Sequence, residues 1–234
     1  LFYLSNKFKQ NNISFFYSDV RDYNSLDYCC KNINYIFHTA ALKHVFFCEK
    51  SPMQGIETNV LGVNNLIKAA TKNNVDKVIF TSSDKAVNPT SVMGTTKLLG
   101  EKLITAANIE NVKTIFATTR FGNVLGSSGS FIPIFKNQIR NNKNLTITDK
   151  KMTRFIMSVE ESVKLVVETC KIAKGGEVFV FKMPSIRVDD VADAMIELYS
   201  SKSKKINKTY IGSKPGEKIY EELLSTEELR RTLE

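Results

Sequence analysis

Short apolar runs alternate with longer amphipathic segments along most of the chain. The apolar runs predict buried strands at residues 13–18, 34–39, 77–81, 114–119 and 177–181. The segments between these runs carry apolar residues at helical spacing and predict helices. Strands that alternate with helical runs of about ten or more residues favour a parallel sheet with helices on both of its faces.

Start and stop signals predict where several helices begin and end. Ser51, Pro52 and Gln54 predict a capping box and a helix that runs to about residue 73. Ser158 and Glu161 predict a second capping box, for a helix that ends near two glycines at residues 175–176. Other helices are expected at residues 1–12, 23–31 and 91–108. Because no start signal precedes the first of these, we expect the sequence to begin inside a helix.

The pattern changes after residue 123, where a Gly/Ser-rich stretch leads into a mixed region. This region predicts helices at residues 131–140 and 188–199, strands at 145–148 and near Thr209, and a closing segment at 214–228. We therefore expect a small α+β substrate-binding cap, formed by residues 124–156 and 184–234. The sheet domain would consist of residues 1–123 and 157–183.

The composition is that of an ordinary soluble globular protein. Of the 234 residues, 42% are hydrophobic and 24% are charged, and the net charge is +9. The basic residues are scattered and no nucleic-acid motif accompanies them, which favours a solvated surface over a nucleic-acid interface. The four cysteines and two histidines offer no zinc-ligand spacing. No apolar run is long enough to span a membrane, and we expect a cytoplasmic location without membrane contact from this segment.

Reactive side chains follow one predicted strand directly. Ser83, Asp84 and Lys85 leave the strand at residues 77–81, and ligands of open α/β sheets bind at the carboxyl ends of the strands. An adjacent acid and amine can divide proton donation and proton abstraction between them. The alternative is an exposed turn with a solvated ion pair, and the spacing does not decide between the two. Met93 and Lys97 lie four residues apart and face the same side of the next helix.

Other candidate residues are weaker when each is taken alone. The loop of residues 40–44 combines small residues with two potential donors, and it is either a ligand-binding loop or a plain connection. Asn59 lies in the middle of a helix, where solvation is the commoner explanation. His38 is interpreted as a core histidine. Arg154 and Glu217 are polar groups among apolar neighbours, suited to holding a phosphate or a ribose, but each alone is more typical of a surface.

The order of short motifs along the chain resembles that of a known superfamily. The motifs are DVRD, HTAALKHV, TNVLG, SSDKAVNP, MGTTK, RFGNVLGS, MTRF and PGEK. Together they resemble the extended short-chain dehydrogenases/reductases, and within these the UDP-N-acetylglucosamine 4,6-dehydratases of polysaccharide and glycan biosynthesis. The resemblance extends from about residue 18 to residue 228. It implies a Rossmann-like, doubly wound parallel sheet, and a homo-oligomer is expected for the full-length protein.

The resemblance also implies a reaction and a role for each matched residue. Bound NAD or NADP oxidises C4 of the sugar, C5 loses a proton as water leaves from C6, and the hydride returns to C6. Asp84 falls on the acid that helps to expel the C6 hydroxyl, Lys85 on the base for the C5 proton, and Ser83 on the hydroxyl at the C4 oxygen. Lys97 falls on the lysine that holds the nicotinamide ribose. The other matched residues are Asp19 and Val20 at the adenine; Ala40, Ala41 and Lys43 beside the cofactor; Asn123 at the nucleotide sugar; and Arg154 and Glu217 at the UDP portion.

Three departures from the family pattern change what is expected. Met93 stands where most of the superfamily has a tyrosine base, which leaves Ser83, Asp84 or Lys85 to take the C4 proton. Lys214 replaces the usual arginine before PGEK. The glycine-rich turn that cradles a pyrophosphate is absent, so we expect at least one β-α-β unit upstream of this sequence. Without it, the chain is expected to be poorly stable and free of cofactor.

Two other functions are compatible with the same motifs. A UDP-sugar epimerase of the superfamily also oxidises a ring carbon but eliminates nothing, and a non-catalytic module would bind NAD(P) or a nucleotide without turnover. The adjacent Asp84 and Lys85 favour dehydration over simple 4-epimerisation. For Lys85 to act as a base its amine must be neutral, and we expect burial against Lys97 and the positive cofactor ring to lower its proton affinity.

Overall fold

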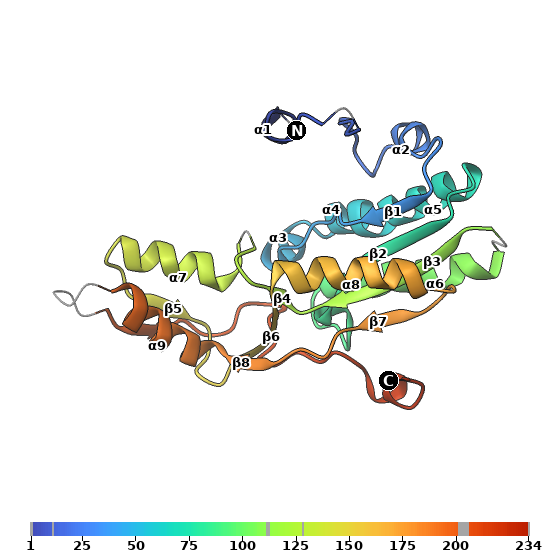
Figure 1. Cartoon of the computed structure of the whole chain (residues 1–234). Helices are drawn as coiled ribbons and strands as arrows, with labels where there is room; N and C mark the ends of the chain where they lie inside the picture. The colour runs from blue at the N-terminus through green and yellow to red at the C-terminus, as the bar shows by residue number, and fades with distance from the viewer. Residues whose placement is uncertain (1, 11, 111–112, 128, 201–205, 234) are drawn as a thin grey trace.

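The molecule is built around a parallel sheet. A computed structural model describes residues 2–10, 12–110, 113–127, 129–200 and 206–233 (Figure 1). The largest sheet has the strand order β1-β2-β3-β7, and all its pairings are parallel. Its strands are β1 (Tyr35–His38), β2 (Lys77–Ser83), β3 (Ile115–Phe121) and β7 (Val178–Val180). Four of the five predicted strands are therefore confirmed, and so is their parallel arrangement.

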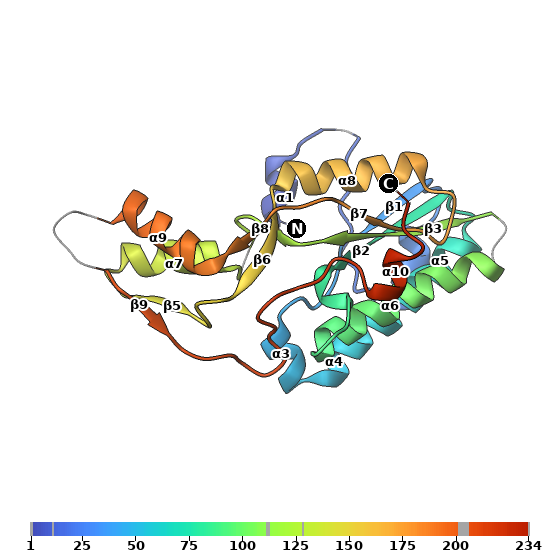
Figure 2. The same cartoon turned by 90° about the horizontal axis from the view of Figure 1, so that it is seen from below.

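Helices cover both faces of this sheet. One face packs against α2 (Tyr23–Cys29), α5 (Gly62–Lys72) and α6 (Val92–Glu110), and the buried cluster there includes Leu66, Val78, Phe80 and Phe116. The other face packs against α8 (Val159–Ile172), where Ile79 and Ala117 meet Ala173. Figure 2 shows α8 on one side of the strands and α5 and α6 on the other. Because both faces are covered, every residue between the ends of β2 and β3 is buried.

The long helix expected from residue 51 is interrupted. It consists of α4 (Pro52–Ile56), a π-helical turn η1 (Glu57–Leu61) and α5. The predicted capping box is wrong, because the Ser51 side chain makes no capping hydrogen bond. An additional helix, α3 (Val45–Lys50), ends directly before Ser51, so this residue joins two helices and does not have the extended backbone of an ordinary N-cap. Gln54 instead donates to Glu57 Oε2 at 3.2 Å.

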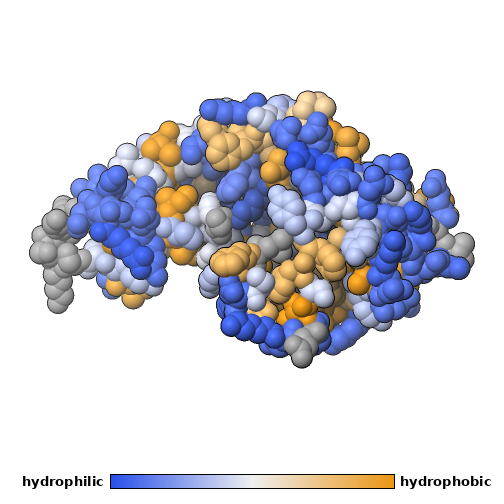
Figure 3. Space-filling model, turned by 90° about the horizontal axis from the view of Figure 1, so that it is seen from above, coloured by the Kyte–Doolittle hydropathy of each residue, from blue (hydrophilic) through white to orange (hydrophobic). Residues whose placement is uncertain are grey.

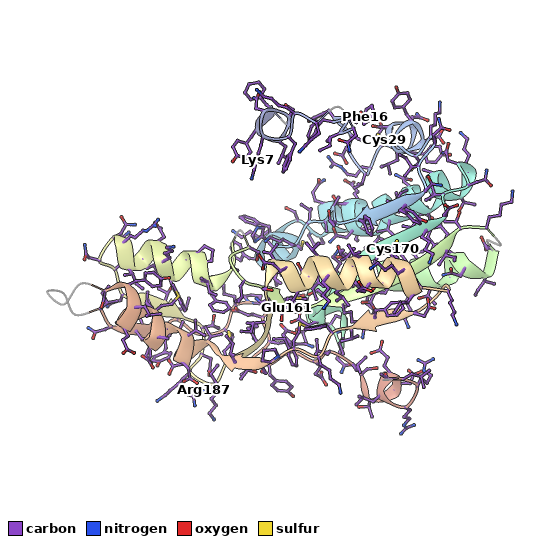
Figure 4. The ribbon with its side chains drawn as sticks, in the orientation of Figure 1. Lys7, Phe16, Cys29, Glu161, Cys170 and Arg187 are labelled. Atoms are coloured by element: carbon purple, nitrogen blue, oxygen red, sulfur yellow. The ribbon has the colours of Figure 1, made fainter. Side chains whose placement is uncertain are left out.

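A second group of elements lies beside the carboxyl end of the sheet. It contains α7 (Phe131–Arg140), α9 (Val188–Tyr199) and β5 (Leu145–Ile147), which share one core, and β9 (Lys208–Tyr210), which pairs with β5 in parallel. A three-stranded sheet connects this group to the main sheet, with the order β4-β6-β8 and the strands β4 (Asn123–Val124), β6 (Thr153–Met157) and β8 (Ser185–Arg187). In Figure 4, Arg187 marks the junction of β8 and α9.

The strand predicted at residues 13–18 is wrong. These residues form no strand, because no described strand lies beside them to complete a ladder. Phe16 lies near α2 (Figure 4), and its ring meets that of Tyr28 edge-on at 5.9 Å between centroids. The helix predicted before this segment is present as α1 (Phe2–Lys7), and residues 1 and 11 of that prediction lie outside the described residues.

The helix end predicted at the two glycines is displaced by a few residues. The Ser158–Glu161 capping box of α8 is confirmed, but the helix ends at Ile172. Its last carbonyls accept hydrogen bonds from the Lys77 amine, at 2.8 Å for Cys170 O and 3.1 Å for Ala173 O. In Figure 4, Glu161 and Cys170 lie toward opposite ends of α8. The glycines at positions 175 and 176, at φ +121° and +88°, form the turn into β7.

The surface mixes hydrophilic residues with apolar patches (Figure 3). Large apolar side chains that are exposed include Phe2, Tyr17, Phe46 and Phe47. Among the residues that the structure describes, none of the helices combines the length and the apolar character that a membrane span requires.

Candidate active site

Three polar side chains form one hydrogen-bonded group at the carboxyl end of β2. Ser83 is the last residue of the strand, and the 3-10 turn η2 (Asp84–Ala86) follows it. Asp84 is fully buried, and its Oδ1 accepts hydrogen bonds from Ser83 Oγ and Lys85 Nζ, each at 2.8 Å. The turn keeps the three residues together, because Ser83 Oγ also accepts the backbone N–H of Lys85. A hydroxyl, a carboxylate and an amine thus share one oxygen atom.

A second carboxyl group, which the sequence analysis missed, faces the same amine. Glu221 lies in the segment between β9 and α10 (Thr226–Leu229), and its Oε1 is 3.8 Å from Lys85 Nζ. Its side chain is only 3% exposed. Burial raises the pKa of Glu221, and the charge of Asp84 adds to this shift. The only sequence signal is an acid between Tyr220 and Leu223 in the closing segment, which is too weak to single it out.

The structure adds two negative groups to the surroundings expected for the Lys85 amine. The charged groups described within 4 Å of it are the carboxylates of Asp84 and Glu221. Lys97 instead directs its own amine to Thr81 O at 2.8 Å.

Lys97 and Met93 are both buried on α6, one turn apart. The Lys97 amine lies 4.7 Å from the centre of the Phe80 ring, and burial lowers the pKa of this amine to about 8. Met93 is 3% exposed and offers no proton acceptor at the position of the usual tyrosine. Gly94 permits the close approach of α6 to η2, because a Cβ there would collide with the Lys85 carbonyl. The helix therefore places Lys97 directly behind the end of β2.

Asn59 holds the loop that follows β1. Its Oδ1 accepts the backbone N–H of Leu42 at 2.8 Å, and its Nδ2 donates to Leu42 O at 2.9 Å and to Thr96 Oγ1 at 3.0 Å. Asn59 is 1% exposed and lies in the π-helical turn η1, a type of turn that is frequent at functional sites. The sequence alone favoured a solvated side chain at Asn59, whereas in the structure Asn59 binds both backbone groups of Leu42 in the loop that follows β1.

The residues predicted beside a cofactor lie at the surface around this loop and α5. Ala40 and Lys43 are exposed, and Ala41 is half-buried. Asp19 is exposed as well, and hydrogen bonds from Arg21 lower the pKa of its carboxyl to about 2. Val20 is half-buried and packs so closely on α5 that a Cβ on Gly62 would lie 2.8 Å from it.

A cavity of about 310 Å³ lies between the main sheet and the second group of elements. This volume is at the lower end of the range of small-molecule sites. Its polar lining includes Lys85, Asn123, Arg154, Lys214, Glu217 and Glu221, and its apolar lining includes Phe46, Phe131, Phe135 and Ile147. Lys85 is thus the member of the strand-end group that reaches the cavity.

Two of the residues predicted to bind UDP are engaged with the chain itself. Arg154 is 6% exposed and donates to the backbone carbonyls of Lys218 at 2.9 Å and Ile219 at 3.2 Å. Glu217 accepts from Thr148 Oγ1 at 3.2 Å. Both residues therefore shape the closing segment as well as the cavity.

Asn123 is positioned differently from these two. It lies on β4, and its Oδ1 is buried without a hydrogen-bond partner among the described residues. An unpaired buried acceptor in a cavity wall is suited to receive a donor from a ligand.

The fold and the site together define a class of protein. A parallel sheet covered on both faces, with polar groups gathered at the carboxyl end of a central strand, is Rossmann-like. The sequence profile of the family described as "Polysaccharide biosynthesis protein" matches residues 3–234, and the chain belongs to this family. The superfamily inferred from the motifs is thereby confirmed.

Relatives with known sequences share almost half of their aligned residues with this chain. An uncharacterized membrane protein of Methanocaldococcus jannaschii is 47% identical, over 98% of this chain and 71% of its own length. A protein of Rickettsia bellii named UDP-glucose 4-epimerase is 48% identical, over 94% of this chain. The chain spans 64% of the length of that Rickettsia relative.

Solved structures share the fold. The X-ray structure of Pen from Bacillus thuringiensis is 45% identical and superposes with a TM-score of 0.94, over 97% of this chain and 71% of that one. DesIV of Streptomyces venezuelae, a dTDP-glucose 4,6-dehydratase solved with NAD and TYD bound, has a TM-score of 0.85 at 18% identity, over 97% of this chain and 76% of its own. At this identity DesIV shows the fold alone.

Proposed function

We propose that the protein is an NAD(P)-dependent enzyme that converts UDP-N-acetylglucosamine to a 4-keto-6-deoxy sugar nucleotide by 4,6-dehydration. The observation that carries the proposal is the hydrogen-bonded group of Ser83, Asp84 and Lys85, whose amine reaches the cavity. Dehydration needs a proton donor for the leaving hydroxyl and a base for the neighbouring carbon, and this group provides both.

The chain offers a place for the cofactor beside this group. Asn59 fixes the loop at residues 40–44, where Ala40 and Ala41 leave the backbone accessible, and Lys97 lies behind the end of β2. DesIV carries NAD in a structure of the same fold, which supports the same cofactor class here. When bound, NAD(P) would accept the hydride from C4 and return it to C6.

Ser83 and Asp84 would take the C4 proton in place of the missing tyrosine. In this proposal the C4 hydroxyl gives its proton to Ser83 Oγ as the Ser83 proton passes to Asp84 Oδ1, across the 2.8 Å hydrogen bond. Asp84 then holds the proton that the leaving C6 hydroxyl needs. Because the carboxyl group is fully buried, this proton stays within the site.

Lys85 would remove the proton from C5. That proton is acidic only while C4 is a ketone, and a neutral amine must stand ready at that moment. The C6 hydroxyl leaves as water with the proton of Asp84, and Lys85 later returns its proton to C5. The five proton transfers balance, and Ser83, Asp84 and Lys85 end in the protonation states in which they began.

The reaction is tested by incubating the purified full-length protein with NAD(P) and UDP-N-acetylglucosamine and following the product by mass spectrometry and proton NMR. Loss of one water supports dehydration, and binding without turnover would point to a non-catalytic module. Lys85→Ala is expected to abolish solvent-deuterium exchange at C5. Lys102→Ala, an exposed lysine on α6, is the matched control and should exchange normally. Wild-type exchange in Lys85→Ala would refute the assigned base.

A UDP-sugar 4-epimerase is the second candidate, supported by the name of the Rickettsia relative at 48% identity. A simple 4-epimerase changes nothing at C5 or C6, so the Asp84–Lys85 pair would have no task there. The same incubation, repeated with UDP-glucose, separates the two functions. An isomeric product of unchanged mass without exchange at C5 would favour epimerisation.

A further inference from the structure

Glu221 has no part in the proposed reaction, yet it is held firmly against the reacting group. Arg154 binds the carbonyls of the residues before it, and the Lys218 amine donates to Val87 O at 2.9 Å, directly after η2. These hydrogen bonds attach the closing segment to β6 and to the residue that follows η2. With the segment held in this position, Glu221 Oε1 lies 3.8 Å from Lys85 Nζ.

The Glu221 carboxyl is not satisfied by structural hydrogen bonds. Its Oε2 is buried and has no hydrogen-bond partner among the described residues, and the same is true of Asp84 Oδ2. A structural carboxylate at this depth would normally accept donors with both oxygens. Its remaining charged neighbours, Arg154 and Lys218, favour its ionised form, whereas burial favours its neutral form most strongly. Glu221 therefore faces Lys85 as a group that can exist in either form.

We propose that Glu221 is a positioning residue, which holds the Lys85 amine at Asp84 and controls how readily this amine gives up its proton. When Glu221 is ionised, the amine lies between two carboxylates and remains an ammonium group. When Glu221 is neutral, the amine faces only one negative charge and loses its proton more easily. This inference rests on the proposed function for its catalytic meaning, but the contact itself can be tested without turnover.

Trace labelling with acetic anhydride at pH 9 tests the contact directly. We expect Lys85 in Glu221→Gln to be acetylated at least about fivefold faster than in the wild type, the factor that unit charges about 4 Å apart give even in bulk water. Glu222→Gln is the matched control, because Glu222 binds Asn88 at 3.0 Å and not Lys85. Equal labelling of Lys85 in wild type and Glu221→Gln would overturn the proposal.

Slow labelling of the buried Lys97 shows that each variant is folded. If Glu221→Gln does not fold, Glu221→Asp replaces it in the labelling experiment. The shorter side chain keeps the negative charge but moves it away from the Lys85 amine. Its Lys85 should then be labelled faster than in the wild type, and an unchanged rate would contradict the contact.

The pH dependence of kcat tests the catalytic meaning. In Glu221→Gln the rise of kcat with pH should lie at lower pH than in the wild type, because the removed carboxylate no longer favours the ammonium form of the base, while KM changes less than about twofold. A purely structural role would leave the position of the profile on the pH axis unchanged, and that result would refute the proposal. If no dehydration occurs at all, the labelling result still stands. If dehydration occurs with unchanged labelling, the proposed function stands and the role of Glu221 does not.

Discussion

Replacing Lys97 with methionine is expected to change how the stability of the protein depends on pH. The Lys97 side chain lies behind the end of β2, 6% exposed, with its amine bonded to Thr81 O and close to the Phe80 ring. Burial lowers the pKa of the amine from 10.5 to about 8. In the unfolded chain the amine recovers its ordinary pKa, so folding and protonation are linked.

The sign and size of this linkage follow from the two pKa values. Between about pH 8 and pH 10.5 the unfolded chain binds a proton that the folded protein does not, so the free energy of unfolding rises with pH. A shift of this size corresponds to about 3 kcal/mol in total, since each pKa unit is worth about 1.4 kcal/mol. Between about pH 7 and pH 10 the wild type should therefore gain about 2 to 3 kcal/mol from this residue alone. Lys97→Met has no such group and lacks this gain.

Urea denaturation of both proteins at several pH values measures the effect. Other lysines, tyrosines and cysteines also titrate in this range, so the informative quantity is the difference in unfolding free energy between wild type and Lys97→Met. The unfolding free energy of the wild type minus that of Lys97→Met should increase as the pH rises. A difference that stays constant from pH 7 to pH 10 would show that the amine is not held in a low-dielectric site.

Three further predictions concern other buried polar groups. Burial lowers the pKa of His38 to about 4, so the wild type should lose about 2 kcal/mol relative to His38→Phe between pH 7 and pH 5 in the same urea assay, and equal slopes would contradict this. The buried guanidinium of Arg120 in β3 binds Glu101 Oε2 at 2.7 Å and Glu228 Oε1 at 2.6 Å. Glu101→Ala should reduce the free energy of unfolding in urea by about 3–5 kcal/mol, because it leaves this guanidinium with one carboxylate fewer. Glu228→Ala removes the more exposed partner of that guanidinium, at 25% exposure, and should cost less, about 1–2 kcal/mol. In the full-length protein, Asn59→Leu should weaken NAD(P) binding at least about tenfold by calorimetry, because Leu42 loses both of its hydrogen bonds to Asn59; unchanged affinity would separate this loop from the cofactor site.

The sequence predicted what depends on local pattern. Apolar runs located β2 and β3, helical spacing gave α7 and α9 with the observed bounds, and the reactive group at Ser83 follows from where β2 ends. These features depend on residues close together in the chain. The strand at residues 13–18 failed because a strand also requires a partner, which local pattern does not specify.

The missed features depend on contacts between distant segments. Glu221 meets Lys85, and Glu228 meets Arg120, only after the closing segment has folded back across the sheet. Ser51 failed as a cap because α3 ends directly before it, a helix that the sequence analysis did not predict. In each case the side chain is ordinary in sequence, and the tertiary structure gives it its environment.

The buried guanidinium of Arg120 has a consequence for synthesis of the chain. Arg120 lies in β3 and binds Glu101, 19 residues before it, and Glu228, 108 residues after it. While the chain emerges from the ribosome, the first carboxylate is already present when β3 forms, and the second arrives far later. Until then Glu101 alone balances the charge of the buried Arg120, and the side of the cavity that the closing segment forms is absent. The first strands of the sheet can thus assemble early, whereas the cavity is completed only by a segment that is made much later than β3.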